Sequence, residues 1–238
     1  MEFQTTQLLN LQDAGSKSLQ QLPPLDKSKH SLLNIKTTLQ NRTKKILKHD
    51  ESRIEEKLKN IKLQSGLINW PALKARHNFE LRAYKGSFYA GEMAHQQRSG
   101  HGVCTYDSGR HYEGGWQADL RHGKGFERFS NGNTFEGDYV NGKVEGKGVY
   151  RWTNGDVYNG EWQGGQKRGQ GKWCGAQGDS YEGQWLDNMA HGPGVHVWAN
   201  GDRYEGHWLY NLRHGHGTDT FANGEQYRGD YVYGKAHG

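Results

Sequence analysis

Apolar residues follow two different spacings along the chain, and the spacing changes near residue 79. Between residues 31 and 64, Leu and Ile recur every three, four or seven positions, which is typical of one face of an amphipathic helix. From Phe79 onward, aromatic residues and glycines alternate with polar residues, which predicts strands whose successive side chains point to opposite faces. The pattern therefore predicts a helical N-terminal region followed by a long β region.

The β region is built on a strict repeat of 23 residues. One copy begins with Tyr112-Glu-Gly-Gly-Trp, continues through a polar link to Gly123-Lys-Gly, and ends in a turn at Asn131-Gly132. A fixed period of this size predicts a repeat architecture in which each unit contacts only its neighbours. A half-copy over 79–88 precedes the copies, which begin at Tyr89, Tyr112, Phe135, Tyr158, Tyr181, Tyr204 and, for a partial copy, Tyr227.

Each copy holds two strands. Tyr112, Gly114 and Trp116 are spaced by two and share one face of the first strand, and Gly123 and Gly125 lie on the second. Asn-Gly dipeptides then supply the turn that leads into the next copy. We therefore predict a mainly β fold: an elongated, single-layer, antiparallel sheet that runs as a meander of about 13 strands, with an amphipathic helix before it.

This pattern divides the chain into four parts. Residues 1–30 are rich in Gln, Ser and Lys and are expected to form a disordered or extended arm. Residues 31–64 form the basic amphipathic helix, residues 65–78 a linker with a short helical cap that starts near Pro71, and residues 79–238 the repeat array.

The predicted helix leaves two partners open. Its apolar stripe packs on a protein surface, either this chain's own sheet or a partner's, or it lies on a membrane surface. Interfacial helices usually carry Trp or Phe on the apolar face, and this helix has neither, which counts against the membrane. Residues 1–78 carry 14 Lys/Arg and 7 Asp/Glu, a balance of +7, and residues 79–238 a balance of −2, so an acidic surface would attract the N-terminal region. Its expected contact residues are Leu32, Ile35, Leu39, Ile46, Ile54, Leu58 and Ile61.

The repeat resembles the MORN repeat: Tyr-x-Gly-x-Trp, a polar link, then Gly-x-Gly, an aromatic residue and a turn glycine. The resemblance covers residues 89–238, with Met93 and Tyr231 where Trp is usual and Gly175 in place of the second-strand aromatic. Proteins with such repeats include radial-spoke head proteins, junctophilins, plant phosphoinositide kinases and histone methyltransferases. The enzymes among them carry a separate catalytic domain, so the resemblance implies a scaffold or adaptor without catalytic residues.

We expect partner proteins to bind in a groove formed by the aromatic and glycine residues of the array. The resemblance favours a cytoplasmic, cytoskeletal assembly, with a ciliary or flagellar axoneme as its setting and a microtubule surface as one candidate partner. The last strand, 227–231, is expected to leave an open edge that permits end-to-end self-association. The predicted groove residues are Tyr89, Tyr112, Trp116, Phe129, Phe135, Tyr139, Trp152, Tyr158, Trp162, Tyr181, Trp185, Trp198, Tyr204, Trp208 and Phe221.

Two alternatives remain for the function. The first is an adaptor that binds lipid and tethers a membrane, although residues 79–238 carry 17 basic and 19 acidic residues and lack a broad cationic surface. The second is the regulatory MORN part of a larger enzyme, because the sequence stops inside a repeat at Gly238. Nucleic-acid binding is not expected, since the array has no basic groove that would follow a phosphate backbone.

Chemistry at single residues is also not expected. Residues at one place in adjacent repeats lie ~10 Å apart, whereas zinc ligands lie ~2 Å from the metal. Cys104 and Cys174 are three repeats apart, too far for a disulfide. Residues 137–144 nearly match a phosphate loop, but they lie between strands. We therefore predict no metal, cofactor or nucleotide site. Solvent-side or turn positions are predicted for the acids Glu113, Glu136, Glu161 and Asp202, and solvent-facing loops for His122, His191, His214 and His237.

Overall fold

The computed structural model describes residues Glu56 and Lys59 and residues 68–237. The chain divides into two units, 1–55 and 56–238, and the described residues belong to the second. The predicted arm and almost all of the predicted basic helix, including its contact residues from Leu32 to Ile61, lie outside the described residues. In the part of the chain that is described, no helix is long and apolar enough to cross a membrane.

A short helix, α4 (Trp70–Lys74), precedes the sheet as the sequence predicts. Pro71 lies in its first turn, where a missing backbone donor does no harm. Asn69 caps the helix: its side-chain oxygen accepts a hydrogen bond from the Ala72 amide at 3.2 Å. On the sheet side, the ring of Trp70 meets that of Phe79 edge to face at 6.1 Å. The helix therefore anchors the entry to the first strand.

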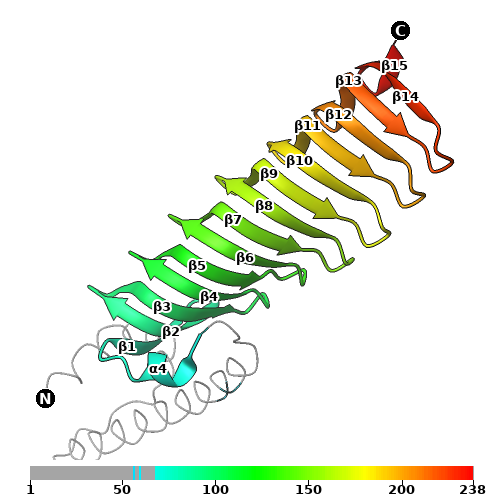
Figure 1. Cartoon of the computed structure of the whole chain (residues 1–238). Coiled ribbons are helices and arrows are strands. Elements are labelled where there is room, and N and C mark those ends of the chain that lie inside the picture. The colour runs from blue at the N-terminus through cyan, green and yellow to red at the C-terminus, as the bar shows by residue number, and fades with distance from the viewer. Residues whose placement is uncertain (1–55, 57–58, 60–67, 238) are drawn as a thin grey trace, which may run out of the picture. The chain divides into compact units, whose positions relative to one another are not determined.

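The rest of the described chain is one antiparallel sheet whose strands follow one another in chain order (Figure 1). Hairpin follows hairpin with no crossover, and each strand pairs only with the strands before and after it. This confirms the predicted mainly β, single-layer array. The strands are β1 (Phe79–Tyr84), β2 (Ser87–Ala94), β3 (Gln97–Tyr106), β4 (His111–Gln117), β5 (Leu120–Arg128), β6 (Thr134–Val140), β7 (Lys143–Arg151), β8 (Val157–Gln163), β9 (Gln166–Cys174), β10 (Ser180–Leu186), β11 (Met189–Val197), β12 (Arg203–Leu209), β13 (Leu212–Thr220), β14 (Gln226–Val232) and β15 (Lys235–His237).

The sheet has 15 strands, so the prediction of about 13 was too low. The half-copy and six full copies account for β1 to β13, and the partial seventh copy adds β14 and β15. The expectation of an open edge at 227–231 needs correction in part. Asp230, Tyr231 and Val232 pair with β15, whereas Tyr227, Arg228 and Gly229 have no partner in that strand.

From Tyr112 to Trp208, each full copy buries its first aromatic residue and the aromatic residue four positions later. The Tyr112 hydroxyl donates to the Gly115 carbonyl at 2.9 Å, and Trp116 Nε1 donates to the Gly102 carbonyl at 3.2 Å. The two rings meet edge to face at 5.1 Å, and Tyr89 of the preceding copy reaches Trp116 at 5.5 Å. Because the polar tips of both rings are satisfied, the rings can be buried without an unpaired donor. These contacts join successive repeats into one continuous core.

The two positions of each Gly-x-Gly element favour glycine for different structural reasons. Gly123 has a φ of +72°, and it lies where the pairing of β4 with β5 shifts register. Such a bulge favours glycine because a side chain strains the left-handed conformation. Gly125 gives room to the ring above it, since a Cβ there would lie 2.5 Å from the Tyr112 hydroxyl oxygen. The glycine pattern that predicts the repeat is therefore a requirement of the bulge and of ring packing.

The two faces of the sheet carry different side chains. Rings such as Tyr112 point to one face, which we call the aromatic face, and the alternate side chains point to the other, the reverse face. At the N-terminal end the reverse face is also buried, with Phe88 2%, Ala90 0% and Val103 0% exposed. Farther along, Glu161 on the reverse face is exposed. The aromatic face is therefore the continuous core of the array.

Candidate functional site

The predicted groove residues all lie on the aromatic face, but most of them are core residues. Eleven of the fifteen are buried and form what we call the inner row. Partner contact through these rings stays a prediction, and their burial leaves little surface for it. The inner-row residues are Tyr89, Tyr112, Trp116, Phe135, Tyr139, Tyr158, Trp162, Tyr181, Trp185, Tyr204 and Trp208.

A second set of rings packs against the inner row and stays partly exposed; we call it the outer row. The sequence predicts three of its members, and it also predicts Phe221, which is 41% exposed. It misses Tyr150 and Trp173 because they stand two residues before the predicted aromatic position, on the same face of the second strand, and it misses Tyr106 although that residue stands at the predicted position of its copy. Comparing the same place in all copies would have found them. The outer row consists of Tyr106, Phe129, Tyr150, Trp152, Trp173 and Trp198.

Four cationic side chains also lie on the aromatic face, and the sequence analysis overlooks them. They occupy one column, meaning the same place in successive repeats, at positions 98, 121, 167 and 213. Each lies over an aromatic ring, the geometry of a cation–π contact. The ring centroids are 4.2 Å away for Arg98 over Trp116, 5.2 Å for Arg121 over Tyr139, 4.1 Å for Lys167 over Trp185 and 4.9 Å for Arg213 over Tyr231.

Two arginines share a buried carboxylate in the N-terminal half of the array. Glu127 is 1% exposed, and its carboxylate accepts hydrogen bonds from Arg110, from Arg121 at 2.5 Å and from the Tyr139 hydroxyl at 2.8 Å. Burial, together with the Glu127 carboxylate, raises the pKa of the Tyr139 hydroxyl above its usual range. This network fills the place where a copy has Tyr139 instead of the usual Trp.

The same solution recurs four repeats later. Asp219 is 7% exposed and accepts hydrogen bonds from Arg213 at 2.5 Å and from the Tyr231 hydroxyl at 2.6 Å. Tyr231 again replaces the usual Trp. In both copies the shorter Tyr ring ends on a carboxylate, whereas Trp116 ends on a backbone carbonyl. Where Tyr replaces Trp, the chain therefore has an acid and an arginine at two other places in the repeat, and the acid accepts hydrogen bonds from both the arginine and the Tyr hydroxyl.

Lys167 differs from the three arginines, because no group of opposite charge among the described residues pairs with it. No carboxylate of the described residues forms an ion pair with its Nζ, which has the rings of Trp152, Tyr158 and Trp185 at 5.7, 5.3 and 4.1 Å. Burial lowers the pKa of the ammonium from 10.5 to about 8. The lysine thus remains protonated at neutral pH in an environment that disfavours its charge.

One predicted solvent-side acid is buried. Glu113 is 0% exposed on the reverse face, and its Oε1 lies 2.6 Å from Nε2 of the buried His111. Alternation predicts which face a side chain takes, but it does not show whether that face is covered. The prediction of a solvent-side Glu113 was therefore wrong, whereas Glu136 and Glu161 are exposed as expected.

The prediction of loop histidines was also wrong. His122, His191 and His214 lie on strands β5, β11 and β13 and are half-buried, each with a buried Nδ1. His191 packs its ring 5.2 Å from that of Tyr210. The turn before each second strand is short, so that strand already includes the histidine. Only His237, on β15, is exposed as predicted.

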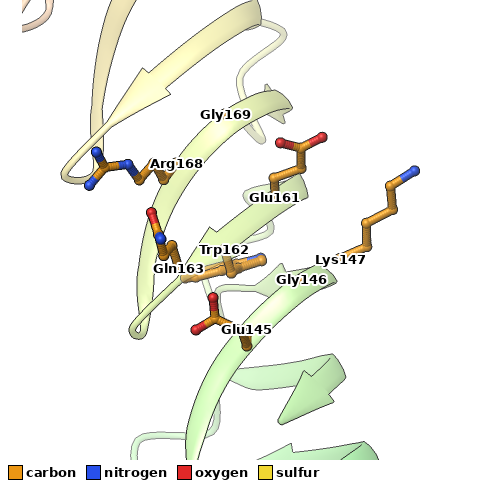
Figure 2. Close-up of a pocket in the computed structure, with 8 residues that line it drawn as sticks. All are labelled: Glu145, Gly146, Lys147, Glu161, Trp162, Gln163, Arg168 and Gly169. Atoms are coloured by element: carbon orange, nitrogen blue, oxygen red, sulfur yellow. The ribbon is translucent and has the colours of Figure 1, made fainter. Parts of the chain in front are cut away.

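A surface hollow crosses β7, β8 and β9 (Figure 2). Trp162 lies between Glu145 and Glu161 in this view, so the two carboxylates do not converge. Each is within hydrogen-bonding distance of a backbone amide, Glu145 at 2.8 Å from Gly164 and Glu161 at 3.3 Å from Gln170. The hollow therefore brings together no acid–base pair.

The described residues contain no cluster of three or more side chains that could hold a metal ion. Cys104 is buried and Cys174 is exposed, and both are free thiols. The two are therefore not joined to each other, as their separation by three repeats predicts.

Solved structures with similar backbones exist, but the likeness is low. The TCP domain of Drosophila melanogaster SAS-4, in complex with a proline-rich motif of Ana2, matches with 10% identity and a TM-score of 0.37 over 66% of this chain and 92% of that chain. The TCP10c domain of Drosophila melanogaster Sas-4 matches with 11% identity and a TM-score of 0.34 over 63% and 97%. A comparison with curated protein sequences finds no match.

A family model for the MORN repeat matches seven consecutive segments of the sequence. The segments are 89–109, 112–134, 135–157, 158–180, 181–203, 204–226 and 227–238. They cover more than half of the chain and follow the same period as the hairpins of the sheet. The chain therefore belongs to the MORN-repeat family.

Proposed function

We propose that this chain is a non-catalytic scaffold or adaptor whose aromatic face binds partner proteins. The observation that carries the proposal is the outer row, whose large rings stay partly exposed although the inner row already forms a continuous core. Aromatic side chains of this kind are typical anchors of protein interfaces. An extended or helical partner segment that covers the outer row would remove apolar area from water.

The setting we propose is a cytoskeletal assembly, and more narrowly a ciliary or flagellar axoneme. This part rests on the resemblance to radial-spoke head proteins and on the basic character of residues 1–78. A cationic segment of this kind complements an acidic protein lattice such as a microtubule. A tagged full chain in ciliated cells should follow an axonemal marker, and a distribution confined to membranes would contradict this setting.

Site-directed photo-crosslinking tests the binding face itself. A photoreactive phenylalanine analogue placed at Trp173, in the outer row, should crosslink the full chain to partner proteins in native extract. The same analogue at Asn159, an exposed reverse-face position on the adjacent strand, is the matched control. Because only one face carries the outer row, crosslinks are expected from position 173 and not from position 159.

A double substitution of Trp152→Ser and Trp198→Ser shows whether the rings matter. These outer-row residues lie on either side of Trp173 along the array, so the crosslinks should be lost while the sheet still forms. Circular dichroism and thermal unfolding check the folding of the variant. Equal crosslinking from both faces, or crosslinks that survive the double substitution, would contradict binding at the aromatic face.

A further inference from the structure

We propose that Lys167 is an acid-recognition point on the aromatic face, where it binds the carboxylate of an Asp or Glu side chain in a partner segment. The inference rests on the proposed function, since it assumes that a segment lies on this face. It adds the chemistry of the segment: an acidic residue flanked by apolar or aromatic residues that cover the outer row.

The other cations of the column provide three internal comparisons. Arg98 has Asp119 at 3.0 Å, and Arg121 and Arg213 each have a carboxylate oxygen at 2.5 Å. Lys167 has no ion-pair partner among the described residues. Since each of the three arginines at this place in the repeat has a carboxylate partner, the missing acid at Lys167 is a local departure and not a property of the architecture.

The two positions that supply an acid to the other cations of the column carry neutral residues beside Lys167. Asp119 accepts the Arg98 backbone amide at 2.9 Å, and Asn188 accepts the Lys167 amide in the same way at 2.9 Å. Asn188 therefore makes the same hydrogen bond to a backbone amide as Asp119 does, but it carries no negative charge. The other source of acid is the column of Glu127, and this column has Trp173 in the copy that contains Lys167. The chain therefore leaves one ammonium open on its aromatic face.

The surroundings of Lys167 suit a carboxylate that arrives with a peptide. Its Nζ lies among rings that include the outer-row Trp152, with Trp173 in the same strand. A segment that covers these rings would exclude water from the ammonium, which strengthens an ion pair. The carboxylate would supply the charge that Asp119 and Glu127 supply elsewhere. Residues on either side of the acid would pack on the aromatic surface.

A peptide selection on the full chain tests this without a known partner. The probes are displayed random peptides of about 12 residues, which span roughly four repeats when extended. Selected sequences should share an Asp or Glu next to apolar residues. Each is then synthesised in two forms, the selected one and one with its acid replaced by the amide. We expect the amide form to bind at least about tenfold more weakly, the usual effect of losing a charged hydrogen bond.

Two variants assign this effect to Lys167. Lys167→Gln should weaken the acidic peptides by the same factor and should not discriminate between the acid and amide forms. The matched control is Lys147→Gln, an exposed lysine whose side chain lies on the reverse face of a nearby strand. It should bind both forms as the unsubstituted chain does. Affinity for the acid form should also fall above pH 8, where the ammonium loses its proton.

The outcomes separate this inference from the proposed function. Peptides that depend on Trp173 but are indifferent to their own acid and to Lys167 overturn the inference alone. Failure to select any peptide that depends on the outer row contradicts both. Inorganic phosphate and vesicles of anionic lipid serve as further probes. If they bind through Lys167 as strongly as the acidic peptides, the site recognises an anion of another class, and the inference is overturned.

Discussion

Glu127 and Lys167 both place a charged group on the aromatic face of the sheet, but only Glu127 has partners of opposite charge there. Glu127 collects two arginines and a tyrosine hydroxyl, so its negative charge is fully matched. The Lys167 ammonium has only aromatic rings around it, and burial lowers its pKa to about 8. The backbone around both residues is the same repeat, so the difference arises from side chains at a few columns.

The repeat has two kinds of position: those that every copy needs in order to fold, and those that differ from copy to copy. The Tyr, Trp and Gly positions recur because the ring and bulge geometry requires them in every copy. The columns of Lys167 and Glu127 do not enter that geometry, and they vary between cation, acid, aromatic and apolar residues. A matched charge in such a column becomes a source of instability only when its partner is removed. An unmatched one lowers stability and is therefore a candidate for function.

Removing the acid at Glu127 should give the largest effect. Glu127→Gln keeps the shape but leaves Arg110 and Arg121 without a counter-charge inside the sheet. Breaking a buried pair from one side is strongly destabilising, and we expect a loss of about 3 kcal/mol in the free energy of unfolding. Urea denaturation followed by tryptophan fluorescence measures it.

Two substitutions calibrate this result. Asp219→Asn removes the equivalent carboxylate near the end of the array and should cost less, because Asp219 has one arginine where Glu127 has two. Glu161→Gln changes an exposed acid on the reverse face and should change the free energy of unfolding by less than about 0.5 kcal/mol. An equal loss in all three variants would show that the buried network is not what distinguishes Glu127.

Removing the charge at Lys167 should have the opposite sign. The lowered pKa means that protonation disfavours the folded state, with a penalty of at most about 3 kcal/mol below pH 8. Lys167→Met also loses a cation–π contact, so we expect a net stabilisation of about 1–2 kcal/mol at pH 7. Thermal unfolding of the variant beside the unsubstituted chain measures it.

The pH dependence of this gain provides the control. As the pH rises from about 8 toward 10.5, the folded lysine loses its proton and the penalty disappears. The advantage of Lys167→Met should therefore shrink between pH 7 and pH 9.5. An advantage that stays constant over this range would mean that packing, not charge, causes the stabilisation.

These residues also show how far sequence reasoning reaches. The period, the hairpins and the inner-row rings follow from spacing alone, because a strand alternates and a glycine pattern repeats. The network at Glu127 does not follow, because its members have different origins: Arg110 precedes β4, Arg121 lies on β5 with Glu127, and Tyr139 lies on β6. The burial of Glu113 could not be predicted either, because the repeat period does not indicate which parts of a face are covered.

A smaller change breaks only one arm of the Glu127 network. Tyr139→Phe removes the hydroxyl that donates to Glu127 and keeps both arginines in place. We expect a loss of about 1 kcal/mol, the usual net value of one hydrogen bond. Tyr231→Phe, which loses the equivalent donor to Asp219, should give a similar value. A loss in Tyr139→Phe as large as that of Glu127→Gln would mean that the hydroxyl, not the ion pairs, dominates the network.

The smallest effect is expected from a substitution that gives Lys167 an internal acid like that of Arg98. Asn188→Asp places a carboxylate where Asp119 stands beside Arg98, and it keeps the hydrogen bond to the Lys167 amide. Because position 188 is exposed, we expect a stabilisation of only about 0.5 kcal/mol. The new charge should raise the pKa of Lys167 from about 8 toward its ordinary 10.5, which NMR titration of the lysine side chain measures.

The same substitution links stability to recognition. An internal carboxylate competes with one from a partner, so acidic peptides should bind Asn188→Asp about threefold more weakly than the unsubstituted chain. Asn211→Asp is the matched control: Asn211 accepts the Ala190 amide in the same way, but Ala190 has no charge to neutralise. If Asn188→Asp raises the pKa of Lys167 and acidic peptides still bind unchanged, the open ammonium is not what they recognise.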